Sequence, residues 1–339
     1  MGIVAIITMI VLFPLNSFLL MSGNLPSNVQ ATAQASGNSI EGMVQGAQAV
    51  KIETIKAQAV ENPQYQPVRN EKVPNLVIPN AHAWAIIDAD TGTLLAGNHA
   101  DDQRQIASLT KMMTATLAME RIKDLNVPIT ADEEEVYIEG TKIGCPRSGY
   151  CISPRLKVGE QVSAKNLLQA MLMNSANDAA VALGKHMGGS QEGFADIMNQ
   201  KAKQMGLNDT HFCTPSGLEP DGRESECYSS ANDIGKIAAY SLRYDTIWDM
   251  FRLPNDSTIT SVDGTVKHSI LNSDLVLDQI PNIIGGKTGF TPLAGYSLLM
   301  GVWDPSHKHR VIVVLLDDSH RWSDVETALE WTFKAYSWK

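Results

Sequence analysis

Segments with the pattern of β-strands lie at both ends of the apolar part of this 339-residue chain, with helix-like segments between them. Near the beginning, the apolar runs 83–88 and 93–97 flank the turn residues 89–92, which predicts a β-hairpin. Near the end, residues 296–303 and 310–316 are strongly apolar and are joined by a polar loop. Because strands must pair, we expect one sheet built from distant segments and packed with helices, an α/β (α+β) fold.

Several helices between these strands begin and end at residues with known preferences. Ser163 is a favourable N-cap for a helix to residue 172, and the polar residues 174–178 interrupt the helical pattern before it resumes. Gly206 ends another helix, as glycine does where the last turn becomes left-handed. A last amphipathic helix is predicted at residues 323–337.

Composition divides the chain into three parts. Residues 1–21 are almost continuously apolar, which predicts a signal peptide or an uncleaved membrane anchor, and both imply export. Residues 22–75 are rich in Ala, Gln, Asn, Ser and Pro, and they predict a flexible linker. Residues 76–339 have the apolar content of a single domain, and we expect no further domain after it.

The formal net charge of the chain is -10, and no segment is rich in lysine and arginine. We therefore expect no nucleic-acid partner. The histidines are scattered, and neither His-Glu-x-x-His nor Cys-x-x-Cys occurs. The sequence thus predicts neither a metal site nor another cofactor.

Four cysteines form two local pairs along the chain: Cys145 with Cys151, and Cys213 with Cys227. Of the three ways to join them, we expect the local disulfides 145–151 and 213–227, because an apolar leader implies an oxidising compartment. The alternative is four unpaired thiols in a cytosolic protein.

Ser108 and Lys111 lie three residues apart in segment 105–114, which reads as the beginning of a buried helix. On a helix this spacing puts both side chains on one face, a turn apart. A serine hydroxyl needs an adjacent base to act as a nucleophile, and a lysine held neutral by burial can be that base. Because Ser-x-x-Lys is a common spacing, its meaning depends on what else the chain supplies.

Two further motifs follow in order along the chain. Ser-Ala-Asn at 175–177 lies where the helical pattern is interrupted, and Lys-Thr-Gly at 287–289 lies at the beginning of a strand-like run. A second Ser-Ala-Asn-Asp begins at Ser230, but its position before a helical run predicts a helix cap. We therefore assign the first copy to the site.

The three motifs in this order are the signature of penicillin-binding proteins and serine β-lactamases. Residues 76–339 resemble the low-molecular-weight penicillin-binding proteins, the serine D-Ala-D-Ala carboxypeptidases, through segments 107–114, 174–180 and 285–291. Shorter matches lie at 215–218, 294–296 and 321. The resemblance implies a β-lactamase/transpeptidase-like fold, with residues 76–339 as the catalytic domain and without the C-terminal β domain of many relatives.

The resemblance also implies a role for each motif residue. Ser108 would attack the bond between two terminal D-alanines and form an acyl-enzyme. Lys111, held neutral by burial and by the charge of Lys287, would remove the hydroxyl proton. Ser175 would relay a proton to the leaving amine, and Asn177 would hold Lys111 and the substrate amide in place.

The implied substrate-binding set is Lys287, Thr288, Gly289, Phe290 and Arg321. Backbone N–H groups of Ser108 and Phe290 would form the oxyanion hole. Thr288 and Arg321 would bind the terminal carboxylate, for which a guanidinium is well shaped. An ordinary surface charge is the alternative for Arg321.

We therefore expect an exported enzyme that removes the terminal D-alanine from peptidoglycan stem peptides and that β-lactams inhibit covalently. The expected membrane contact is the N-terminal segment. Three alternatives remain open: a D,D-endopeptidase with the same residues, a serine β-lactamase, and a non-catalytic penicillin-binding scaffold at the cell wall. No convincing Glu-x-x-Leu-Asn element for fast deacylation accompanies the motifs, and this argues against the lactamase.

Overall fold

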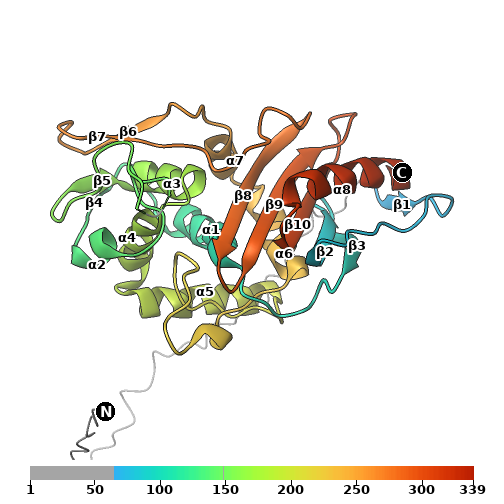
Figure 1. The fold of residues 1–339 in the computed structure, drawn as a ribbon, viewed down its shortest axis with the longest axis horizontal. Helices are drawn as coiled ribbons and strands as arrows, with labels where there is room; N and C mark the ends of the chain where they lie inside the picture. The colour runs from blue at the N-terminus through green and yellow to red at the C-terminus, as the bar shows by residue number, and fades with distance from the viewer. Residues whose placement is uncertain (1–64, 148) are drawn as a thin grey trace, which may run out of the picture. The chain divides into compact units, whose positions relative to one another are not determined.

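The computed structural model describes residues 65–147 and 149–339. Their largest sheet has five antiparallel strands in the order β3-β2-β10-β9-β8 (Figure 1). The strands are β1 (Pro67–Arg69), β2 (Ala81–Asp88), β3 (Thr93–Asn98), β4 (Pro128–Thr130), β5 (Gln161–Ser163), β6 (Thr258–Thr260), β7 (Lys267–Ser269), β8 (Ile283–Thr291), β9 (Gly295–Trp303), β10 (Arg310–Asp318) and β11 (Tyr336–Trp338). The helices are η1 (Ala107–Thr110), α1 (Lys111–Arg121), α2 (Glu133–Tyr137), α3 (Ala164–Met173), α4 (Asn177–Gly188), α5 (Gln191–Met205), η2 (Glu224–Glu226), α6 (Ala231–Ser241), α7 (Asp245–Phe251) and α8 (Arg321–Ala335).

The strands β2, β9 and β10 of the five-stranded sheet are buried on both faces, which explains why they are largely apolar runs. On β10, Val313 and Leu315 belong to one core cluster with residues of α8, whereas Ile312 and Val314 belong to the other cluster with α1 and α6. Alternate side chains of a strand point to opposite faces, so both sets are apolar. Figure 1 shows α8 lying against β9 and β10. The predicted sheet of distant segments is confirmed.

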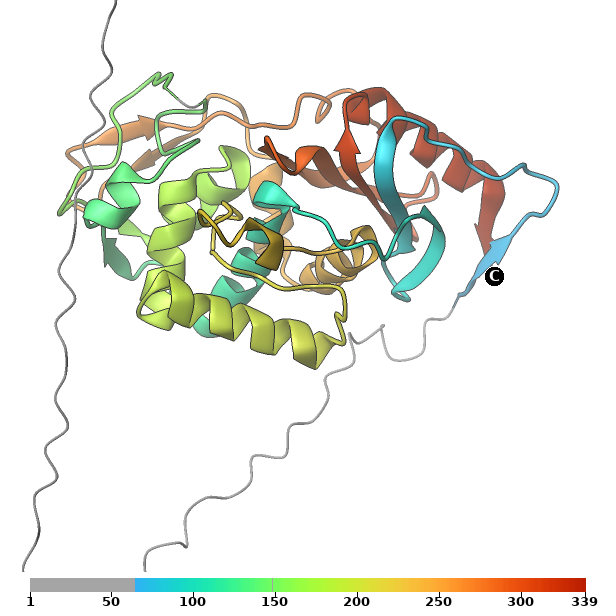
Figure 2. The ribbon, with the colours of Figure 1, turned by 60° about the horizontal axis from the view of Figure 1, so that its bottom comes forward.

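Most helices form a cluster on the other side of the sheet from α8. Figure 2 shows α3, α4 and α5, in green to yellow-green, packed together beside the sheet. Helix α1 lies inside this cluster and contacts α3, α4 and α6. The nearly complete burial of α1 follows from its position in the middle of the helices.

The predicted helix boundaries at small polar residues and glycine are confirmed. Ser163 caps α3 by accepting a hydrogen bond from the backbone of Asn166, and Gly206 ends α5 in the left-handed conformation. Ser230 caps α6 in the same way, through the backbone N–H of Asp233. The second Ser-Ala-Asn-Asp is therefore a helix cap, as its sequence context predicted.

Part of the segment predicted as linker forms a strand. The predicted linker included residues 65–75, but the strand β1 in this segment pairs with β11. Three residues are too short to show a strand pattern, and their partner lies at the far end of the chain, so no local signal marks them. The predicted leader 1–21 and the rest of the linker lie outside the described residues.

No helix in the described part of the chain is long and apolar enough to cross a membrane. Both predicted disulfides are present: Cys145 is bonded to Cys151, and Cys213 to Cys227. The loop closed by the second bond contains Ser216, whose backbone oxygen reaches the site described next.

Candidate active site

Ser108 lies on η1 and Lys111 is the first residue of α1, so the two share one continuous turn. Lys111 Nζ lies 2.8 Å from Ser108 Oγ. The residue before the serine, Ala107, has a φ of 48°. Non-glycine residues seldom adopt this left-handed conformation, and where they do, the surrounding structure must hold them there.

The amine of Lys111 is buried and has two further partners from distant parts of the chain. Nζ lies 2.8 Å from Asn177 Oδ1 and 2.6 Å from the backbone oxygen of Ser216. Burial, followed by the charge of Lys287, lowers the pKa of Lys111 well below its ordinary value. A lowered pKa favours the neutral amine, whose lone pair can accept the hydroxyl proton of Ser108.

Ser175 lies in the tight turn between α3 and α4, with a φ of 57°. Segment 139–141 fixes this turn. Thr141 Oγ1 donates to the backbone oxygen of Ser175 at 2.7 Å, and the backbone N–H of Asn177 donates to the backbone oxygen of Thr141 at 2.8 Å. Asn177 Nδ2 donates to the backbone oxygen of Glu139 at 2.8 Å. The amide oxygen of Asn177 is thereby left to face Lys111.

Lys287 is fully buried on β8 and faces the same turn. Its Nζ donates to Ser175 Oγ at 2.9 Å and to the backbone oxygen of Thr288 at 2.7 Å. Burial lowers the pKa of Lys287 to about 7, with Asp274 opposing the shift and Arg321 adding to it. Near neutral pH this lysine therefore exchanges its proton readily.

Strand β8 is the edge of the five-stranded sheet, and it packs directly against η1. A Cβ at Gly289 would lie 3.0 Å from the backbone oxygen of Ile106, so glycine allows the strand to approach the turn that carries Ser108. Thr288 Oγ1 donates to Ser273 Oγ at 2.9 Å. The hydroxyl of Thr288 is thus oriented by the loop before β8.

Phe290, Tyr296 and Arg321 form a stack beside the strand edge. The rings of Phe290 and Tyr296 lie 4.6 Å apart, and the guanidinium of Arg321 lies 4.7 Å from the ring centroid of Tyr296. Arg321 also acts on the pKa of Lys287, so its charge reaches the centre of the site. Arg321 is therefore a partly buried cation held in place by an aromatic ring.

The structure brings together the five motif residues that the sequence singled out: Ser108, Lys111, Ser175, Asn177 and Lys287. Sequence reasoning missed the groups that support them. Ser216 and Glu139 contribute backbone oxygens, for which a side chain gives no signal. Asp274 acts on Lys287 from a separate loop.

The family model and the curated relatives that match this chain are D-alanyl-D-alanine peptidases. The model of the family described as D-alanyl-D-alanine carboxypeptidase matches residues 70–320. The carboxypeptidase DacF of Bacillus subtilis (strain 168) is 29% identical over 263 residues, which cover 76% of this chain and 63% of the relative. DacA of Escherichia coli (strain K12) is 32% identical over 233 residues, covering 67% and 54%. The chain thus spans less than two thirds of these relatives.

A D-alanyl-D-alanine endopeptidase of Escherichia coli (strain K12) is also similar, with 32% identity over 216 residues that cover 63% of this chain and 64% of the relative. Among solved structures, the D-alanyl-D-alanine carboxypeptidase of Mycobacterium tuberculosis H37Rv has a TM-score of 0.67 and 27% identity, covering 79% of this chain and 96% of that one. Penicillin-binding protein D2 of Listeria monocytogenes, in its ampicillin-bound form, has a TM-score of 0.63 and 29% identity, covering 77% and 100%.

Proposed function

Because this chain belongs to the D-alanyl-D-alanine carboxypeptidase family, we propose that it removes the terminal D-alanine from peptidoglycan stem peptides. The observation that carries the proposal is the buried amine of Lys111, 2.8 Å from Ser108 Oγ. A hydroxyl and an amine of lowered pKa at hydrogen-bond distance form the nucleophile and base that acyl transfer needs. The substrate is inferred from the family, and the acyl-transfer chemistry is inferred from the geometry of the site.

Acylation begins with the proton of Ser108. A neutral Lys111 has two N–H groups. These can donate hydrogen bonds to its two oxygen partners, Asn177 Oδ1 and the backbone oxygen of Ser216. Its lone pair then faces Ser108, and the amine takes the proton as Oγ attacks the carbonyl of the penultimate D-alanine. The fixed partners keep the lone pair aligned without a change of structure.

The developing negative charge needs donors at the edge of β8. We assign this role to the backbone N–H groups of Ser108 and Phe290, since the strand packs against η1. An oxyanion donor of this kind contributes about 3 kcal/mol to transition-state stabilisation. The aromatic stack of Phe290 on Tyr296 keeps this end of the strand in place.

Departure of D-alanine requires a proton on its nitrogen. Ser175 Oγ, which accepts a hydrogen bond from Lys287, is placed to relay that proton. We assign the terminal carboxylate of the substrate to Lys287, Thr288 and Arg321, because a carboxylate favours two cations and an oriented hydroxyl. Water then hydrolyses the acyl-enzyme, with Lys111 again as the base.

β-Lactams would acylate Ser108 by the same steps, and the resulting acyl-enzyme would be hydrolysed slowly. The structure of the Listeria relative with ampicillin supports this expectation. We propose that the enzyme works outside the cytoplasm, in agreement with its two disulfides. The proposed route there is the apolar segment 1–21, as a cleaved signal or an anchor, followed by the linker before a single catalytic domain.

A D,D-endopeptidase is the second candidate, because the similar Escherichia coli protein carries that name. Both reactions would use the same nucleophile and base. They differ in the amine that is released when Ser108 is acylated: free D-alanine in one and the amino group of a cross-linked peptide in the other.

The test uses the purified full chain and Ser108→Ala. The unmutated protein should be labelled covalently by a fluorescent penicillin and should release D-alanine from diacetyl-Lys-D-Ala-D-Ala, and the variant should do neither. If the unmutated protein shows no label and no release, the enzymatic proposal is wrong. Covalent labelling without release of D-alanine would favour the non-catalytic scaffold. Rapid hydrolysis of penicillin would favour the β-lactamase. Cleavage of cross-linked muropeptides without release of D-alanine from the short peptide would favour the endopeptidase.

A further inference from the structure

Asp274 is a buried carboxylate that the proposed reaction does not use. It lies in the loop between β7 and β8, and its side chain is 4% exposed. Oδ1 accepts a hydrogen bond from the backbone of Val276 at 3.0 Å. Oδ2 is buried and has no hydrogen-bond partner among the described residues. A buried carboxylate oxygen without a donor is costly unless a nearby charge compensates for it.

The unpaired oxygen faces the strand of the active site. A Cβ at Gly286 would lie 2.6 Å from Asp274 Oδ2, so the carboxylate packs against the backbone immediately before Lys287. Two hydrogen bonds fix Ser273, the residue before Asp274. Ser273 accepts from Thr288 and donates its backbone N–H to Met173 at the end of α3. The carboxylate therefore cannot move away from β8 without disturbing the site.

Few charges act on this carboxylate. Burial raises its pKa, and in the described part of the chain the charges that act on it are Lys287, which favours the ionised form, and Asp278, which opposes it. Around Lys287 the charges are Asp274, which favours the ammonium, and Arg321, which opposes it. Lys111 is the neighbouring cation whose own pKa Lys287 lowers. Asp274 is the anion that acts on Lys287 within this group.

We propose that Asp274 is a positioning residue of the active site, a buried counter-charge that favours the ammonium form of Lys287. Its effect passes from Asp274 to Lys287 and from Lys287 to Lys111, whose pKa is lowered first by burial and further by the charge of Lys287. The expected effect of Asp274 on the rate of acylation rests on the function proposed above. Its expected effect on the charge of Lys287 is independent of that function.

The direct test follows the charge of Lys287 by NMR. The side-chain carbon resonance of Lys287, assigned by its loss in Lys287→Arg, is titrated in the unmutated full chain, in Asp274→Asn and in Asp278→Asn. The midpoint should lie near pH 7 and fall by about one unit in Asp274→Asn, the smaller end of the shifts that a nearby opposite charge produces. The exposed control Asp278→Asn should leave it unchanged. An unmoved midpoint in Asp274→Asn would overturn the proposal.

A second measurement needs no variant. If the two groups interact, the carboxyl resonance of Asp274 in the unmutated protein should show a step where Lys287 loses its proton. Absence of that step would also overturn the proposal, so a failure of Asp274→Asn to fold does not remove the test.

The effect on catalysis is read from acylation by a fluorescent penicillin between pH 5 and 10, a range of about five units around the lysine titrations. The alkaline limb of the profile should move to lower pH by about one unit in Asp274→Asn, and Asp274→Glu should restore part of the shift. A uniform loss of rate with an unchanged profile would mean a structural role only. If the unmutated protein is not acylated at all, the proposed function fails, while the NMR titration still tests Asp274.

Discussion

At the scale of single residues, identical tetrapeptides have different uses in this chain. Ser175 and Ser230 both begin a Ser-Ala-Asn-Asp. Ser175 has a φ of 57° and accepts a hydrogen bond from Lys287, whereas Ser230 has an extended backbone and caps α6. The side chains are the same, and the backbone conformation decides which partner each hydroxyl meets.

The two serines therefore give a matched pair of substitutions. Ser175→Ala should slow acylation by penicillin about 100-fold or more, because a proton relay is lost, with little change in stability. Ser230→Ala should leave the acylation rate unchanged and reduce the free energy of unfolding by about 1 kcal/mol, the usual value of an N-cap. Stopped-flow labelling and urea unfolding measure the two quantities. Equal effects of both variants on acylation would contradict this assignment.

Much of the site at this scale could be predicted from the sequence, because side chains with a fixed spacing carry a chemical signal. Ser108 and Lys111 are the clearest case. The backbone oxygen of Ser216 could not be predicted, since any residue at that position provides one. Asp274 could not be found either, because a single aspartate in an irregular loop gives no pattern.

At the scale of elements, the loop closed by Cys213 and Cys227 packs closely against η1. Gly217 in this loop has a φ of 83°, and a Cβ there would lie 2.0 Å from the backbone oxygen of Ala107. Only glycine permits this approach, which brings the Ser216 oxygen to Lys111. The loop thus places one of the fixed partners of the buried amine.

Gly217→Ala tests this fit, with Gly222→Ala of the same loop as its control. Gly222 also has a positive φ, 76°, but a Cβ there would meet nothing within 4 Å. We expect Gly222→Ala to cost about 1 kcal/mol for its conformation alone and to leave acylation unchanged. Gly217→Ala should cost about 3 kcal/mol or more, because a steric clash adds to the strain, and should slow acylation.

Thermal unfolding measures the loss of stability in both variants, and penicillin labelling measures their rates of acylation. Equal losses of stability would mean that conformation alone requires the glycine at position 217. A large loss of stability with normal labelling would mean that the Ser216 oxygen does not need its present position.

The longer helices and the long strands could be predicted from the sequence, since caps and apolar runs are local signals, whereas the short helices α2 and α7 were not predicted. The short strands could not be predicted either. Strand β1 has three residues and pairs with β11 at the other end of the chain. The helix around Ser108 was predicted, but its first turn is the 3₁₀ segment η1, since Ala107 enters it from a left-handed conformation that no residue type announces.

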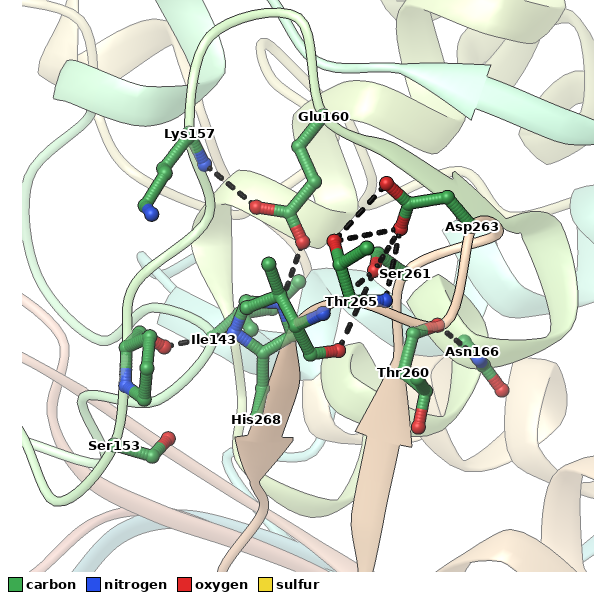
Figure 3. A network of polar contacts seen from close by, with 12 residues as sticks. Ile143, Ser153, Lys157, Glu160, Asn166, Thr260, Ser261, Asp263, Thr265 and His268 are labelled. Atoms are coloured by element: carbon green, nitrogen blue, oxygen red, sulfur yellow. Dashed lines mark hydrogen bonds and ion pairs between the residues drawn. The ribbon is translucent and has the colours of Figure 1, made fainter.

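At the scale of the whole molecule, polar side chains join segments that are far apart in the sequence. Figure 3 shows His268 of β7 between the loop that contains Ser153 and the side chain of Glu160. Its Nδ1 lies 2.7 Å from the backbone oxygen of Pro154, and its Nε2 lies 2.6 Å from Glu160 Oε1. Both side chains are buried, at 0% and 7% exposure, so each depends on the other for its hydrogen bond.

Substitutions of Glu160 separate the charge from the hydrogen bond. Glu160→Ala should lower the free energy of unfolding by about 3 kcal/mol or more, because a buried partner of His268 is removed. Glu160→Gln should cost less, since an amide of the same length keeps a hydrogen-bonding group beside His268 Nε2. Guanidinium unfolding of both variants provides the comparison. A loss for Glu160→Ala that does not exceed the loss for Glu160→Gln would contradict this interpretation.

The order of strands in the central sheet also has a consequence during synthesis. Strand β2 lies between β3 and β10, yet more than 200 residues separate the end of β2 at Asp88 from the beginning of β10 at Arg310. At ordinary rates of translation, roughly 10–40 s pass between the two. The apolar β2 therefore leaves the ribosome long before its partner exists. A nascent chain of this protein has to be kept from aggregating until its last strands have been made.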